Sequence, residues 1–181
     1  MGRIRLIRPT KEHEEEVMNY RAEMFEAGSS FDGCAGLEKM ESYEEWLNFD
    51  GRLKAKYGED YVPSHVYLAV RLSDGRVVGI IDHRTRLSEF LLNYGGNVGY
   101  SIRPSERRKG YAKEMLELLC IICKKEGVER LLITCDKENP ASAKTILANG
   151  GVLENEVEDV PGLGESGVVQ RYWIELSKIK P

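Results

Sequence analysis

The chain has 181 residues, the length of one domain with a well-buried core, and leaves little room for a second domain. It is 41% hydrophobic and 31% charged, which is typical of globular proteins, and its net charge of −4 argues against a general nucleic-acid-binding role. No apolar run is long enough to span a membrane, and the first residues lack the apolar centre of a signal peptide. We therefore expect one domain over residues 1–181, cytoplasmic, with no nucleic-acid or membrane partner.

The first third of the chain predicts one strand and two helices. Residues 4–8 alternate apolar and basic side chains and predict an opening strand. Residues 11–27 carry apolar side chains at helical spacing, and residues 42–56 predict a second helix. Between them, residues 28–36 contain three glycines and two serines and predict a loop.

The middle of the chain changes to the period of strands. Residues 65–72 and 76–84 are β-rich and are separated by Ser73-Asp74-Gly75, a strong hairpin signal. A polar loop is expected over residues 85–96, followed by a strand at residues 97–102.

The last part of the chain predicts two helices and three strands. Residues 110–126 form the clearest helix, which Gly127 ends, and residues 139–149 form another. Strands are expected over residues 128–135, 152–157 and 170–176. The order βααβββαβαββ predicts an α/β fold in which helices cover both faces of a mixed sheet.

Two of the four cysteines, Cys120 and Cys123, form a C-x-x-C pattern, which can indicate a metal or redox site. They lie within the apolar run 118–123, and no second C-x-x-C or histidine pair supplies zinc ligands. We therefore expect buried thiols that pack as small hydrophobic side chains, and no metal site.

A turn dense in positive charge connects the strand at residues 97–102 to the helix at residues 110–126. Four cationic side chains fall within seven residues: Arg103, Arg107, Arg108 and Lys109. The first amides of a helix bind phosphate well, and a glycine at Gly110 lets an anion approach the backbone. The spacing matches neither the nucleoside-triphosphate P-loop nor the dinucleotide fingerprint.

The run Arg107-Arg108-Lys109-Gly110-Tyr111-Ala112 matches the [QR]-x-x-G-x-[GA] signature of the GNAT N-acyltransferase superfamily. Residues 99–104 resemble that family's preceding strand, and Asn139-Pro140-Ala141-Ser142 resembles its later N-x-x-[AS] helix start. The element order is also similar, although the sequence-specific part covers residues 97–151. The resemblance implies a GNAT-like, mostly antiparallel twisted sheet of about seven strands.

The resemblance also implies an acetyl-CoA site. The amides of residues 107–112, named here the cradle, would hold the pyrophosphate, and the Arg107, Arg108 and Lys109 side chains would neutralise its charge. The strand residues Tyr100, Ser101 and Ile102 would line the pantetheine arm, with a backbone amide at Tyr100 stabilising the oxyanion. Asn139 and Ser142 would contact the same arm. A solvated turn and a plain helix cap at Asn139 are the alternatives.

Two positions depart from the family pattern. Ile146 occupies the position at which many members carry a tyrosine that protonates the CoA thiolate, and Asn97 occupies that of a glutamate base. Direct transfer remains feasible, because the thiolate is a fair leaving group and water can relay protons.

Other residues are weaker candidates for the acceptor side. Asp82 could act in catalysis or could instead bind a cationic acceptor, and His83 could be a base or a surface histidine. Tyr94 with Gly95-Gly96 could shape the acceptor entrance or form a simple loop tip. Cys135 could carry the acyl group or be a buried thiol.

The sequence therefore predicts an N-acetyltransferase that moves an acetyl group from acetyl-CoA to a primary amine of a small-molecule or peptide acceptor. The alternative is an acyl-CoA-binding or regulatory module with little catalysis. The acceptor is not predicted, because it depends on the loops at residues 28–36, 85–96 and 161–167. The sequence leaves open whether the chain forms a homodimer.

Overall fold

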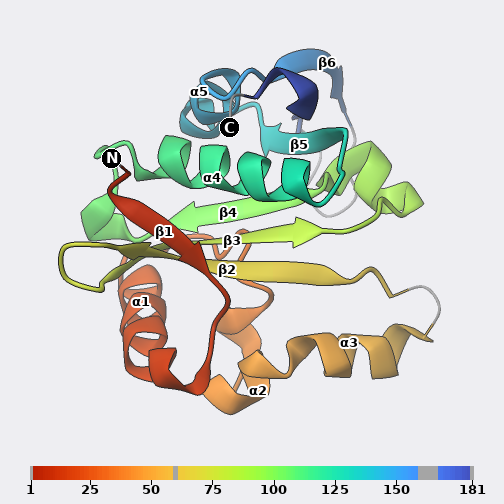
Figure 1. The fold of residues 1–181 in the computed structure, drawn as a ribbon. Helices are drawn as coiled ribbons and strands as arrows, with labels where there is room; N and C mark the ends of the chain where they lie inside the picture. The colour runs from red at the N-terminus through yellow and green to blue at the C-terminus, as the bar shows by residue number, and fades with distance from the viewer. Residues whose placement is uncertain (1, 59–60, 159–166, 180–181) are drawn as a thin grey trace. The chain divides into compact units, whose positions relative to one another are not determined.

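The computed structural model describes residues 2–58, 61–158 and 167–179 (Figure 1). The chain divides into two compact units, Met1–Arg86 with Gly99–Met115, and Leu87–Val98 with Leu116–Pro181. Each unit is described by itself. No helix in the described ranges combines the length and apolar character needed to cross a membrane.

The first unit is built on a sheet whose strands follow the order β1-β2-β3-β4. Its elements are β1 (Ile4–Ile7), α1 (Glu14–Glu26), α2 (Tyr43–Leu47), α3 (Phe49–Tyr57), β2 (Ser64–Arg71), β3 (Val77–Arg84) and β4 (Val98–Ile102). Strand β2 is antiparallel to both β1 and β3. The hairpin predicted at Ser73-Asp74-Gly75 is confirmed, with Gly75 in the left-handed conformation (φ 76°) that such turns require.

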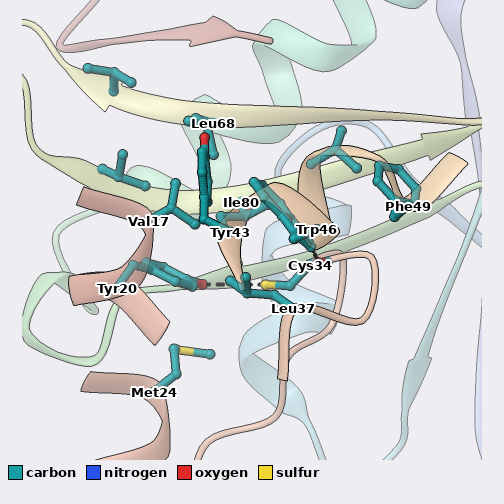
Figure 2. Packing of buried hydrophobic residues seen from close by; sticks show 13 residues of the cluster. Val17, Tyr20, Met24, Cys34, Leu37, Tyr43, Trp46, Phe49, Leu68 and Ile80 are labelled. Carbon is teal, nitrogen blue, oxygen red and sulfur yellow. Dashed lines mark hydrogen bonds between the residues drawn. The ribbon is translucent and has the colours of Figure 1, made fainter. Parts of the chain in front are cut away.

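The core of the first unit lies where α1, α2 and the segment between them meet the sheet (Figure 2). Val17, Tyr20 and Met24 of α1 are fully buried, as their helical spacing predicts, and Leu68 and Ile80 come from the sheet. Each large apolar side chain buried in this way stabilises the fold by about 1.5–3 kcal/mol.

The helix predicted over residues 42–56 is in fact two helices. Ser42 caps α2 by accepting a hydrogen bond from the Glu45 amide at 3.1 Å. The backbone leaves the helical region at Asn48 (φ −97°, ψ 15°), which ends α2 and begins α3. Asparagine side chains compete with helical hydrogen bonding, and here the Asn48 amide group donates to the Glu44 carbonyl.

The second unit contains an antiparallel sheet with the order β5-β7-β6. Its strands and the helix between them are β5 (Arg130–Asp136), α5 (Pro140–Leu147), β6 (Val152–Val157) and β7 (Val169–Glu175). Helix α4 (Tyr111–Lys125) precedes β5 and, as predicted, ends at Gly127 in a left-handed turn (φ 83°). The mostly antiparallel character is confirmed, but the seven strands of the described residues form two sheets rather than the single predicted sheet.

The segment predicted as a polar loop at residues 85–96 contains a helical turn, Leu91–Gly95, with π-helical hydrogen bonding. The Gly96 amide donates to the Leu91 carbonyl at 2.6 Å. The side chain of Arg171 donates to the Leu92 carbonyl at 2.9 Å and holds this turn to β7. Tyr94, predicted near the acceptor entrance, lies in this turn.

Candidate active site

The cradle contains two residues in the left-handed backbone conformation, and one of them is not a glycine. After β4, a short 3-10 turn (Pro104–Glu106) leads to Arg107 in an extended conformation and Arg108 with φ 60°. A left-handed conformation costs a residue other than glycine about 1–2 kcal/mol. Gly110 is also left-handed (φ 84°), and its carbonyl accepts the Glu114 amide as α4 begins. Turns with left-handed residues in alternation are typical of anion-binding backbone amides.

Two of the three predicted phosphate-neutralising side chains are held within the first unit. The Arg107 guanidinium donates to the Ile102 carbonyl at 3.1 Å and to Ser29 Oγ at 2.9 Å. Lys109 Nζ donates to Glu106 Oε2 at 2.9 Å. The third, Arg108, is exposed and has no hydrogen-bond or ion-pair partner among the described residues. Arg108 is thus the cradle side chain best placed to meet an incoming anion.

Glu106 supports the cradle from within the unit. Its carboxylate is 4% exposed and also forms an ion pair with Arg71 at 2.8 Å. Burial disfavours its ionised form, but the hydrogen bond from Lys109 and the charge of Arg71 outweigh burial and lower the pKa of Glu106. The carboxylate is therefore ionised and fixed, and it orients Lys109.

The side chain of Ser101 points into the core of the first unit. Ser101 Oγ lies 2.8 Å from Tyr20 Oη and 3.1 Å from Cys34 Sγ. Figure 2 shows Tyr20 and Cys34 directed toward each other, and Cys34 is fully buried. Burial raises the pKa of Cys34 to about 12 and raises that of Tyr20 well above its usual value. Ser101 can therefore contact a ligand only through its backbone, and Cys34 is a neutral thiol.

The loop at residues 28–36 lies directly against β4. A Cβ atom on Gly33 would stand 2.2 Å from the Gly99 carbonyl oxygen and 2.6 Å from the Tyr100 nitrogen. Gly33 is also left-handed (φ 75°), so both space and conformation require glycine. The loop therefore sets the position of the strand predicted to line the pantetheine arm.

Asp82 is buried beside the same strand. Its Oδ1 accepts the Gly99 amide at 2.8 Å, its Oδ2 accepts Ser64 Oγ at 3.1 Å, and Arg84 lies 3.5 Å from Oδ2. Burial raises the pKa of Asp82, and Arg84 and the Gly99 amide offset part of that rise. Both oxygens are thus engaged within the protein, an arrangement that positions β4 rather than one that offers a carboxylate to an acceptor.

His83 is 3% exposed and not the surface histidine considered above. It faces His65 across the β2–β3 pair, with ring centroids 6.2 Å apart.

In the second unit, Asn97 forms two hydrogen bonds to β5. The backbone amide of Asn97 donates to the Leu132 carbonyl at 2.6 Å, and its side-chain Oδ1 accepts the Leu132 backbone amide at 2.9 Å. The preceding Gly96 is left-handed (φ 67°), and a Cβ there would stand 2.8 Å from the Leu132 oxygen. The residue at the family's base position therefore has a structural role, which the sequence alone did not indicate.

Asn139 caps α5 by accepting the Ser142 amide at 3.1 Å, so its predicted role as a helix cap is confirmed. Its contact with pantetheine stays a prediction. Ile146, in the same helix, is fully buried. A Cβ on Gly151 would stand 2.4 Å from Ile146 Cγ2, so the packing against Ile146 requires a glycine at position 151.

The antiparallel sheets, the element order and the turn between β4 and α4 agree with the fold that the sequence resemblance implies. The family model described as Acetyltransferase (GNAT) domain matches residues 3–152, so the chain belongs to the GNAT acetyltransferase family. No curated protein sequence matches the chain significantly.

Solved structures of acetyltransferases share this fold at low sequence identity. The microcin C7 self-immunity acetyltransferase MccE, in complex with acetyl-CoA and AMP, is 17% identical with a TM-score of 0.69, over 97% of this chain and 93% of that one. A Salmonella typhimurium acetyltransferase that modifies the N-terminal serine of ribosomal protein L7/L12 is 18% identical with a TM-score of 0.67, over 97% and 96%. A spermidine N-acetyltransferase chimera from Vibrio cholerae and hSSAT is 16% identical with a TM-score of 0.64, over 98% of each chain.

Proposed function

We propose that the protein transfers an acetyl group from acetyl-CoA to a primary amine by direct attack on the thioester. The observation that carries this proposal is the cradle, with its left-handed Arg108 and Gly110 at the start of α4. Its amides bind the pyrophosphate, and the unpaired Arg108 guanidinium adds a charge-assisted contact. The acetyl-CoA bound in the MccE structure is consistent with this donor.

In the reaction, the amine nitrogen attacks the acetyl carbonyl carbon, a C–N bond forms, and the C–S bond breaks as CoA thiolate leaves. A backbone amide at Tyr100 stabilises the oxyanion, and water accepts the ammonium proton and protonates the thiolate. An acyl-cysteine intermediate is disfavoured, because burial raises the pKa of both Cys34 and Cys135. A raised pKa disfavours the thiolate that such an intermediate needs.

The acceptor is a small-molecule or peptide amine. The similar structures include a protein that modifies an N-terminal serine and one that acts on spermidine, and both of these substrates present an amine. An acceptor panel should therefore contain a polyamine, peptides with free N-termini, and a peptide with an internal lysine.

The test is to incubate the full chain with acetyl-CoA and each amine, and to measure free thiol together with the acetylated product by mass spectrometry. The proposal expects thiol release that depends on the amine and matches the product formed. Binding of CoA without turnover on any amine would contradict it and would favour the binding-module alternative.

A matched pair of glycine variants locates the site. Gly110→Ala should abolish CoA binding, because the cradle needs the left-handed conformation and a Cβ would also stand 3.3 Å from Arg3 Nη2. Gly75→Ala carries the same left-handed strain (φ 76°) in the distant β2–β3 hairpin, with no atom within 4 Å of the added Cβ. Gly75→Ala should leave CoA binding unchanged.

A further inference from the structure

The start of β1 lies beside the start of α4, although the two are far apart in the sequence (Figure 1). Arg3 Nη1 donates to the Lys109 carbonyl at 2.8 Å, across 106 positions of the chain. Its guanidinium carbon lies 4.7 Å from the centre of the Tyr111 ring. One side chain outside the family signature thus contacts the cradle at two points.

Arg3 also forms an ion pair with Glu114 in the first turn of α4. Arg3 Nε donates to Glu114 Oε2 at 2.9 Å, and Nη2 lies 2.9 Å from the same oxygen. Glu114 Oε1 accepts the backbone amides of Arg3 and of Ile4, the latter at 3.1 Å. The carboxylate is therefore fixed by the side chain and by the main chain of the N-terminal strand.

This placement has an electrostatic consequence. A carboxylate in the first turn of a helix is stabilised by the helix dipole, but it repels a phosphate that approaches the same amides. Arg3 compensates the Glu114 charge at 2.9 Å, and Glu114 is mostly shielded from solvent, with its side chain 17% exposed. Without Arg3, the cradle would present an unpaired negative charge to its ligand.

Arg3 further restricts the cradle backbone. Its Nη2 would lie 3.3 Å from a Cβ on Gly110, so the guanidinium packs over the glycine. The hydrogen bond to the Lys109 carbonyl fixes the peptide between Lys109 and Gly110, with the carbonyl toward Arg3 and the amide of Gly110 on the opposite side.

We propose that Arg3 is a positioning residue for CoA binding, which orients the Lys109–Gly110 peptide and neutralises Glu114. This inference rests on the proposed function, because it assigns a role within the same cradle. Arg3 acts through the cradle backbone and Glu114, since its Nε, Nη1 and Nη2 atoms each contact Lys109 or Glu114.

The test compares the wild type with Arg3→Ala, Glu114→Gln and the double variant, by calorimetric titration with CoA and by steady-state kinetics. Arg3→Ala should weaken CoA binding about tenfold, the loss of one charge-assisted hydrogen bond together with the exposed Glu114 charge. In the kinetics, Arg3→Ala should raise the KM for acetyl-CoA and leave kcat nearly unchanged. The double variant should bind CoA at least about threefold more tightly than Arg3→Ala, because Glu114→Gln removes the repulsion.

Arg3→Lys and Arg5→Ala are the matched controls. Lysine keeps the charge but not the two-point contact, so Arg3→Lys should bind CoA with intermediate affinity. Arg5 is an exposed residue of β1, and Arg5→Ala should bind CoA as the wild type does.

Equal CoA affinity of Arg3→Ala and the wild type would overturn the inference. The inference would also be overturned by a double variant that binds CoA no more tightly than Arg3→Ala, since that result is expected if Arg3 only stabilises the local fold. Failure of the proposed function would look different, because the wild type itself would then bind no CoA, or would bind CoA without acetylating any amine of the panel.

Discussion

The carboxyl group of Asp82 shows how one buried residue can hold a neighbouring strand in position. It accepts the Gly99 amide and the Ser64 hydroxyl, and it lies near Arg84. An unsatisfied buried amide costs about 1–3 kcal/mol, so β4 keeps its place at Gly99 only while an acceptor is present.

Asparagine can supply that acceptor without a charge. Asp82→Asn should therefore keep kcat/KM within about tenfold of the wild type, whereas Asp82→Ala should fold less stably by about 1–3 kcal/mol and lose more activity. Steady-state kinetics and urea unfolding measure both effects. A loss beyond a hundredfold in a folded Asp82→Asn would identify Asp82 as a base.

The raised pKa of Asp82 also has a consequence for stability. The folded state binds this proton more tightly than the unfolded state, so the contribution of Asp82 to stability falls as the pH rises above its usual value of 3.8. Asp82→Asn removes that ionisation penalty. At neutral pH the variant should be at least as stable as the wild type.

At the scale of elements, the backbones of the loop at residues 28–36 and of β4 are in close contact because two glycines, Gly33 and Gly99, lie where they meet. Gly33 stands against Gly99 and Tyr100, while Gly99 stands against Asp82. The adjacent hydrogen bonds of Ser101 with Tyr20 and Cys34 extend this contact into the core.

Two alanine variants in this loop separate contact from conformational strain. Gly33→Ala should destabilise the protein by about 3 kcal/mol or more, since it combines strain with overlap, and should raise the KM for acetyl-CoA. Gly28 is also left-handed (φ 58°), but a Cβ added there would meet no atom within 4 Å. Gly28→Ala should therefore lower the free energy of unfolding by only about 1 kcal/mol. Equal costs in denaturant unfolding would contradict the close contact between the loop and β4.

The turn between β4 and α4 depends on the buried Glu106, whose ion pairs hold Arg71 and Lys109. Glu106→Gln leaves these cations without a buried counter-charge and should destabilise the protein by about 3 kcal/mol at neutral pH.

The pH dependence of that loss has a defined sign. The pKa of Glu106 is lowered, so its stabilising effect is complete above its usual value of 4.5 and is lost as the pH falls through the lower folded value. Unfolding measured from pH 7 downward should show the difference between Glu106→Gln and the wild type shrinking in acid. A difference that stays constant would contradict the ionised carboxylate.

At the scale of the whole chain, the features that the sequence predicted are those with local causes. The Ser73-Asp74-Gly75 hairpin, the end of α4 at Gly127 and the cap at Asn139 each depend on residues within one turn. The start of α4 directly after Gly110 also belongs to this group, because the glycine and the helix start are adjacent, whereas CoA binding by the cradle stays a prediction.

The features that the sequence did not predict depend on contacts between distant residues. Nothing near Arg3 in the sequence points to Glu114, and nothing near Gly33 points to Gly99. The side chain of Asn97 was recognised only as a missing glutamate, because its bond to Leu132 needs the pairing of separate segments. Within the part of the chain that the structure describes, the division of the strands into sheets of four and three arises from pairing of the same kind. The single domain over residues 1–181 stays a prediction.

The claim that the cradle binds CoA is tested most directly by hydrogen–deuterium exchange of the full chain with and without CoA. Exchange reports the protection of individual backbone amides, and bound pyrophosphate accepts hydrogen bonds from the amides that it contacts. Peptides that cover residues 107–114 should exchange more slowly with CoA, and the same peptides of Gly110→Ala should show no change. Protection confined to other parts of the chain, with residues 107–114 unaffected, would contradict the account.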